Sequence, residues 1–253
     1  REISDLLNWR ALPLLQEVTS VADNIGKTRS YGLELVLNTV NINNRDFTWS
    51  SDLTFSFSRS KWKERSSSWV GNAYDKYDGW INAFSGYYVA DGLVQPGETI
   101  PHMPDALPGQ VKIKDINGYC YNDDGTYKVD EHGLPILSGE PDGRINDADR
   151  IIVGPSGPGF IMGFNNTFRW KDFDLNLYFY GHFNQWNAGC YKDFWLDNVG
   201  NLSMSGNTTT AVKDMWSVDN PDGWRPGFAQ EQSSFRLHST TYFIKKMWFV
   251  RCR

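Results

Sequence analysis

Two stretches of this chain alternate apolar and polar residues for longer than ordinary strands do. From Phe47 to Arg59 most odd positions are apolar and the even positions are polar. The stretch from Phe164 to Phe183, FNNTFRWKDFDLNLYFYGHF, alternates twice, with Lys171-Asp172 as a two-residue link. Successive side chains of a β-strand point to opposite faces, so each run predicts a strand with one apolar and one polar face. The first run is about thirteen residues long, whereas the usual strand has about 5–6.

The pattern predicts an all-β chain of long antiparallel strands, and helix signals are nearly absent. We expect five strands, near 29–40, 47–59, 160–170, 173–183 and 242–251, and two long loops, 60–159 and 184–240. The turns NINNRD and Lys171-Asp172 join the strands within each hairpin. Long strands with short turns at one end and long loops at the other favour a transmembrane β-barrel segment with extracellular loops. A soluble β-sandwich also alternates, because one face of each sheet packs on its partner, and it remains the alternative.

Composition excludes several classes of protein. The net charge of −5 lacks the basic footprint of a nucleic-acid-binding protein. No run approaches eighteen apolar residues, so we expect no transmembrane helix. Cys120, Cys190 and Cys252 are scattered, which argues against a disulfide framework or a zinc site. The four histidines show no ligand spacing and the common catalytic motifs are absent, so we do not expect an enzyme.

One pattern resembles a calcium-binding loop that has been split by an insertion. The stretch KDINGY is followed, after an insertion, by PDGRINDADR, and together they give the ligand order of an EF-hand-type loop. The expected metal ligands are Asp115, Asn117, Asp142, Arg144 through its carbonyl, Asn146 and Asp149. The loop can close around calcium only if the insertion forms an excursion of its own. The alternative is a metal-free turn rich in Asp and Asn.

Aromatic residues gather in the two long loops. Rings mixed with Asp, Asn and Gly suit stacking on a sugar or gripping a peptide, and they equally suit small cores inside long loops. The candidate ligand-binding residues are Trp80, Tyr87, Tyr88, Trp186 and Trp195. Two rival functions follow from these features: a secreted carbohydrate-binding β-sandwich, and a glycoside hydrolase with two converging carboxylates.

Four segments resemble the C-terminal barrel region of SusC/RagA-type TonB-dependent outer-membrane transporters. The first, NIGKTRSYGLELVLNTVNINNRDFTWSSDLTFSFSRSKW, is similar to a strand, turn and strand of that family. ALPGQVKIKDINGY with DGRINDADRIIVG is similar to its D-x-N-G-D-G segment, which this chain interrupts after Asn117-Gly118. PGFIMGFNNTFRWKDFDLNLYFYGHFNQ resembles the next hairpin, and MWSVDNPDGWRP a late W-x-x-D-N-P loop. The segments occur in family order over most of residues 24–226.

The resemblance implies part of a large barrel of 22 strands with a plug in its lumen. The plug and the TonB-binding part would precede Arg1, and further strands would follow Arg253, so we expect this chain to be a fragment without a plug domain. The implied function is uptake of oligosaccharides or peptides across the outer membrane of a Gram-negative bacterium. The implied partners are a SusD-like lipoprotein, the TonB complex and the lipid bilayer, with no nucleic acid. The odd positions of the 173–183 strand would face lipid and the even positions the lumen.

Overall fold

The computed structural model describes residues 1–11, 20–24, 26–66, 69–187, 210–227 and 240–253, and most of its regular structure is β-strand. Across those ranges the helical elements are three short 3-10 helices, η1 (Asp147–Asp149), η2 (Thr210–Asp214) and η3 (Thr241–Phe243). No helix in this described part is long and apolar enough to cross a membrane. The chain is therefore an all-β structure, as its alternating pattern predicts.

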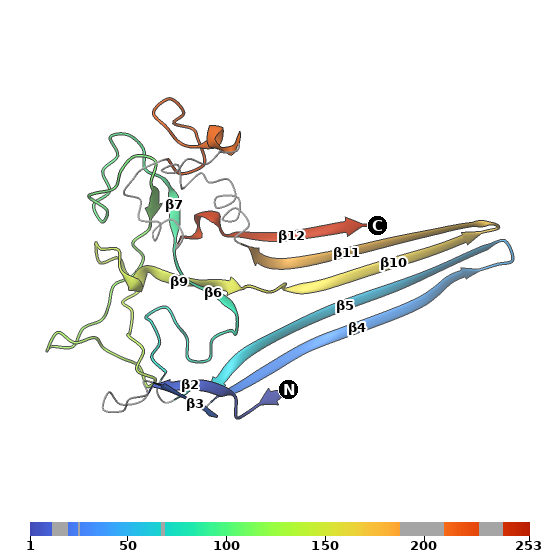
Figure 1. Ribbon diagram of the computed structural model, residues 1–253, viewed down its shortest axis with the longest axis horizontal. Coiled ribbons are helices and arrows are strands. Elements are labelled where there is room, and N and C mark those ends of the chain that lie inside the picture. The colour runs from blue at the N-terminus through green and yellow to red at the C-terminus, as the bar shows by residue number, and fades with distance from the viewer. Residues whose placement is uncertain (12–19, 25, 67–68, 188–209, 228–239) are drawn as a thin grey trace.

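A six-stranded antiparallel sheet dominates the structure, in the order β1-β4-β5-β10-β11-β12. Its strands are β1 (Glu2–Ile3), β4 (Lys27–Asn43), β5 (Phe47–Glu64), β10 (Phe160–Trp170), β11 (Phe173–Asn187) and β12 (Lys245–Cys252). A separate two-stranded sheet pairs β2 (Leu7–Ala11) with β3 (Ser20–Asn24). The hairpins β4–β5 and β10–β11 extend far from the rest of the chain (Figure 1). Several strands run past the expected bounds, and the last begins three residues later than expected because η3 occupies 241–243.

Cross-strand register gives the sheet two chemically different faces. One row of directly paired residues is apolar and crosses four strands: Leu37, Leu53, Phe164 and Phe179. The adjacent row points to the other face and is polar: Asn38, Asp52, Asn165 and Tyr178. Because the side-chain period of a strand is two, a slip of one residue would exchange the faces, so the pattern specifies this register. Large apolar side chains on the first face are exposed, including Leu35 at 50% and Phe173 at 72%.

The predicted 60–159 loop contains strands that the sequence analysis missed. β6 (Ala83–Tyr88) pairs with β9 (Arg150–Pro155), and β7 (Ala90–Leu93) pairs with β8 (Val111–Ile113). Two small cores hold this region together: one of Tyr88, Val94, Ile100, Met103 and Ile113, and another of Leu93, Val111, Trp216 and Phe243. The loops thus form a folded body at the end of the long hairpins (Figure 1).

One polar cluster interrupts the apolar face near the short turns. The cluster lies beside a bulge in β4 after Val40, where the Asn41 side-chain amide donates to the Ser51 hydroxyl at 2.6 Å. Asn166 on β10 accepts from Ser51 at 2.8 Å and from the Trp49 indole N–H at 3.1 Å. Ser51 and Asn166 are only 8% and 6% exposed. A polar group placed among apolar side chains is costly unless it is hydrogen-bonded, and these bonds meet that condition.

Replacing Asn166 with Leu is expected to destabilise the sheet by about 1–3 kcal/mol, because the buried Ser51 hydroxyl and Trp49 indole lose their shared acceptor. The matched control is Asn165→Leu on the opposite face, which loses only a 3.3 Å bond to Asp52. Denaturant unfolding of the intact protein measures both changes. Equal losses for the two variants would contradict a special role for the cluster.

Candidate functional site

The split acidic loop closes in the structure, although twenty or more residues separate its halves. Asp149 ends η1 and is fully buried, at 0% exposure. Its Oδ1 accepts the backbone N–H groups of Ile116 at 2.8 Å and Asn117 at 3.2 Å, and its Oδ2 accepts that of Asn146 at 2.9 Å. The carboxylate therefore ties the first half of the loop to the second.

A second carboxylate joins the two halves from the other direction. Asp115 accepts the backbone N–H of Asp142 at 3.2 Å and that of Gly143 at 2.6 Å. Asp142 in turn accepts the Arg144 N–H at 2.9 Å and the Asn146 amide at 3.3 Å. Gly143 has a φ of 83°, a left-handed conformation that glycine adopts without steric cost. All six residues predicted as metal ligands thus lie in one closed loop.

The insertion between the halves folds on itself through a cycle of backbone hydrogen bonds. Cys120 donates to the Ile136 carbonyl, Ile136 to that of Lys128, and Lys128 to that of Cys120, at 2.8–2.9 Å. At the base, Ser138 donates to the Gly118 carbonyl at 2.9 Å. Residues 119–137 therefore leave the acidic loop and return to it at one point, which is the condition that closure required.

Ring contacts fix the insertion against its surroundings. The His132 ring stacks on Tyr77 with centroids 3.9 Å apart, and Leu134 is buried next to Gly71. Tyr119 lies 4.6 Å from Tyr127, and burial, aided by the charge of nearby Asp147, raises the pKa of its phenol to about 12. The insertion is thus part of the folded loop body.

Backbone and side-chain amides already donate hydrogen bonds to the acidic residues of the closed loop. In the described ranges, no group of three or more His, Cys, Asp or Glu side chains is placed to hold a metal ion. A metal-free turn would be closed by hydrogen bonds of this kind alone. A carboxylate has about four lone-pair positions, and Asp149 uses three of them for backbone N–H groups. Any calcium site must therefore combine the remaining carboxylate positions with amide and carbonyl oxygens.

The predicted ligand-binding rings that the structure describes are engaged in contacts within the protein. Tyr88 is 6% exposed and belongs to the first loop core, with the Arg150 guanidinium 4.8 Å above its ring. Tyr87 is half-buried on β6 beside Phe84. The Trp186 indole covers Gly154 of β9 so closely that no side chain fits there.

Trp80 lies beside β5 and takes the Lys61 ammonium 4.5 Å above its ring. Trp195 falls outside the described residues. The four described rings therefore all make packing contacts, as expected if the aromatic residues of the long loops form small cores.

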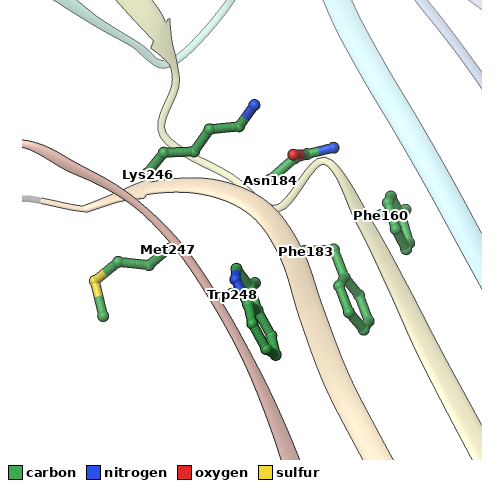
Figure 2. A pocket seen from close by; sticks show the side chains of 6 residues that line it. All are labelled: Phe160, Phe183, Asn184, Lys246, Met247 and Trp248. Carbon is green, nitrogen blue, oxygen red and sulfur yellow. The ribbon is translucent and has the colours of Figure 1, made fainter.

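Two hollows lie on the strands themselves, where the sequence analysis named no site. One, of about 310 Å³, opens on the apolar face and is lined by Phe160, Phe183, Asn184, Lys246, Met247 and Trp248 (Figure 2). The other, of about 220 Å³, is lined by Tyr178, Tyr180, Arg251 and Arg253. The sequence feature that could have indicated these hollows is the alternation in β12, KKMWFVRC, because it places cations on both faces of the sheet.

Comparison with curated sequences finds TonB-dependent receptors. The chain is 32% identical over 248 residues to TonB-dependent receptor P3 of Formosa agariphila, covering 92% of this chain and 22% of that protein. It is 26% identical over its whole length to TonB-dependent receptor SusC of Bacteroides thetaiotaomicron, again covering 22% of the relative. No family model matches the chain. The chain thus spans about a fifth of the length of these relatives.

Comparison with solved structures finds the same architecture. The RagAB peptide transporter matches with a TM-score of 0.65 and 18% identity, over 99% of this chain and 25% of that one. The RagAB peptide importer in its closed-closed state matches with a TM-score of 0.62. At this identity the likeness shows the fold, an antiparallel segment similar to part of the RagA barrel.

Proposed function

This chain belongs to the TonB-dependent receptors of the SusC type, and on that premise we propose that it forms wall strands and outer loops of a nutrient transporter in a bacterial outer membrane. Its named relatives are receptors and transporters, not enzymes. The proposed cargo is an oligosaccharide or a peptide, imported with energy from the TonB complex. The proposed partner is a SusD-like lipoprotein at the loop end of the strands.

The observation that carries this proposal is the two-faced sheet. β10 has eleven residues, which at about 3.4 Å per step span about 34 Å. With a strand tilt of about 40°, this length covers about 26 Å along the membrane normal, close to the apolar band of about 25 Å in outer-membrane barrels. Aromatic residues mark both ends of the band, with Trp170 and Phe173 at the turns and Phe160 and Phe183 at the loops.

The two ends of the sheet differ as a barrel requires. The two short turns lie together at one end, where the Lys171 N–H donates to the Asp46 carbonyl at 3.0 Å. The folded loop body lies at the opposite end (Figure 1). We therefore propose that the turns face the periplasm and the loop body faces the outside. In the described part of the chain no second sheet covers the apolar face, whereas the sandwich alternative needs one.

Uptake by whole cells tests the proposed function. Cells with the intact gene product, cells without it, and cells with TonB inactivated would receive labelled malto-oligosaccharides, oligogalacturonates and short peptides. We expect uptake of one class to require both the receptor and TonB. Uptake that persists without TonB, or no uptake of any class, would reject the proposal.

We also propose that the closed acidic loop takes a calcium ion, and the support is the EF-hand-type order of its ligands and the meeting of its two halves. Because no three of the described acidic side chains converge on one point, the ion would be bound largely by amide, carbonyl and water oxygens. For a site with a Kd near 10⁻⁴–10⁻³ M, as in extracellular modules, 10 mM calcium is expected to stabilise the intact protein by about 1.4–2.7 kcal/mol. Thermal unfolding with calcium, with magnesium and with a chelator measures the effect. Asp142→Asn should remove the calcium dependence because it removes a candidate ligand charge. If calcium leaves the melting temperature unchanged, the loop is the metal-free turn.

A further inference from the structure

The hollow on the apolar face lies between β11 and β12, where their pairing is irregular. The register shifts between His182 and Gln185, so β11 carries an extra residue there. Asn184, within the shift, has a φ of 52°, and it lines the hollow together with Trp248. A bulge bends its strand and disrupts the local ladder. The hollow of about 310 Å³ is therefore a product of this bulge.

Aromatic rings form the floor of the hollow. The Phe160 and Phe183 rings stack with centroids 4.7 Å apart and nearly parallel planes, and Phe55 lies 5.5 Å from Phe160. Trp248 on β12 is 70% exposed. Figure 2 shows Phe160, Phe183 and Trp248 in a row on three neighbouring strands, with Met247 pointing away from them. This row lies at the loop end of the apolar band, the depth at which aromatic girdles occur.

Cations lie just beyond the rings on the same face. Lys246 is two residues from Trp248 towards the loop body, and the alternation of β12 places both on the apolar face. Arg59 occupies the equivalent place on β5, two residues beyond Phe57, with its guanidinium 5.1 Å above that ring. Lys246 is exposed and makes no ion pair with any described residue. Lys and Arg at such positions reach into the headgroup layer while their stems stay against apolar surface.

We propose that this hollow binds a phosphate-bearing lipid of the outer leaflet, with an acyl chain against Phe160, Phe183 and Trp248 and the phosphate on Lys246. The inference rests on the membrane placement proposed above. The occupant is a lipid because the floor is continuous with the lipid-facing surface, so an acyl chain reaches it without leaving the bilayer. It is an anionic lipid because, among the described residues that line the hollow, the one charged side chain is a cation.

The test uses the intact receptor purified in detergent and native mass spectrometry. The probes are lipid A with two phosphates, the same lipid after dephosphorylation, and inorganic phosphate. We expect Lys246→Gln to lower retention of phosphorylated lipid A about fivefold, which corresponds to about 1 kcal/mol for one cation near an anionic headgroup. Retention of the dephosphorylated lipid should not change. Trp248→Ala should lower retention of both lipids, and inorganic phosphate alone should not bind.

The matched control is Lys245→Gln, because Lys245 is the next residue and points to the opposite face, 5.8 Å from the Trp224 ring. Equal losses for the two lysine variants, or equal retention of lipid A with and without its phosphates, would overturn the lipid site.

Outer-membrane fractionation of the unmodified protein distinguishes failure of the lipid site from failure of the proposed membrane placement. A receptor that fractionates with the outer membrane and transports, yet retains both lipids equally, overturns the lipid site alone. A receptor absent from that fraction overturns both.

Discussion

Arg in place of Leu37 is expected to destabilise the intact protein by about 2–4 kcal/mol, the cost of a cation at the midplane of a barrel's lipid face. Leu37 is half-exposed and pairs directly with Leu53, midway along the apolar band. In the described part of the chain, the apolar-face positions of β5 near Leu37 carry no carboxylate, and in the proposed membrane placement the guanidinium lies too deep to reach water easily. Unfolding by denaturant in a lipid or detergent environment measures the loss.

Val36→Arg is the control, because Val36 is the preceding residue, is also exposed, and pairs with Thr54 on the polar face. We expect a change of less than about 1 kcal/mol, since lumen substitutions alter selectivity more than stability. If Val36→Arg is the more harmful of the two, the assignment of faces is reversed. If both are tolerated, the apolar face does not contact lipid.

Asp149→Asn is expected to unfold the acidic loop. The fully buried carboxylate accepts three backbone N–H groups, and bonds to a charged acceptor contribute about 1.5–3 kcal/mol each. An amide NH₂ in place of Oδ2 would face the Asn146 N–H, donor against donor. We expect a loss of about 3 kcal/mol or more, confined to the loop body. Limited proteolysis should then cleave between residues 115 and 149.

Asp147→Asn provides the comparison within the same 3-10 helix. Asp147 is 53% exposed and pairs with Arg150 at 3.0 Å, so its loss should cost at most about 1 kcal/mol. Rapid cleavage of both variants would mean that the segment is sensitive to any change of charge. Protection of the Asp149→Asn variant would show that the carboxylate does not hold the loop closed.

The sheet could be predicted from the sequence because period-two alternation reports directly on strand faces. Phe164 and Phe179, which the alternation placed on one face, are direct partners in the register. The alternation does not identify the bulge at His182–Gln185, because one extra residue is too small a change in the pattern to be recognised in the sequence. The last strand was expected too early, since Thr241 to Phe243 extend the apolar run but form a 3-10 helix capped by Thr240.

The sequence predicts which residues make up the acidic loop, but it does not predict how they are arranged in space. The acidic residues identify a loop, but whether its halves meet depends on how the insertion folds, and hydrogen bonds such as that from Cys120 to Ile136 have no local sequence signature. The strands β6 to β9 are three to six residues long, too short for alternation to identify them. Tyr88 looked like a ligand-binding ring because ring chemistry alone does not distinguish a core residue from a surface one.

The insertion begins and ends at neighbouring backbone atoms, Gly118 and Ser138, and this has a consequence for how such receptors diversify. A segment whose ends already touch can change length while its point of attachment stays in place, at the cost of the contacts that His132 and Leu134 make with Tyr77 and Gly71. Doubling the length of a flexible loop costs only about 0.6 kcal/mol in closure entropy. The loop body can therefore change through residues 119–137 while the strands of the long sheet remain as they are.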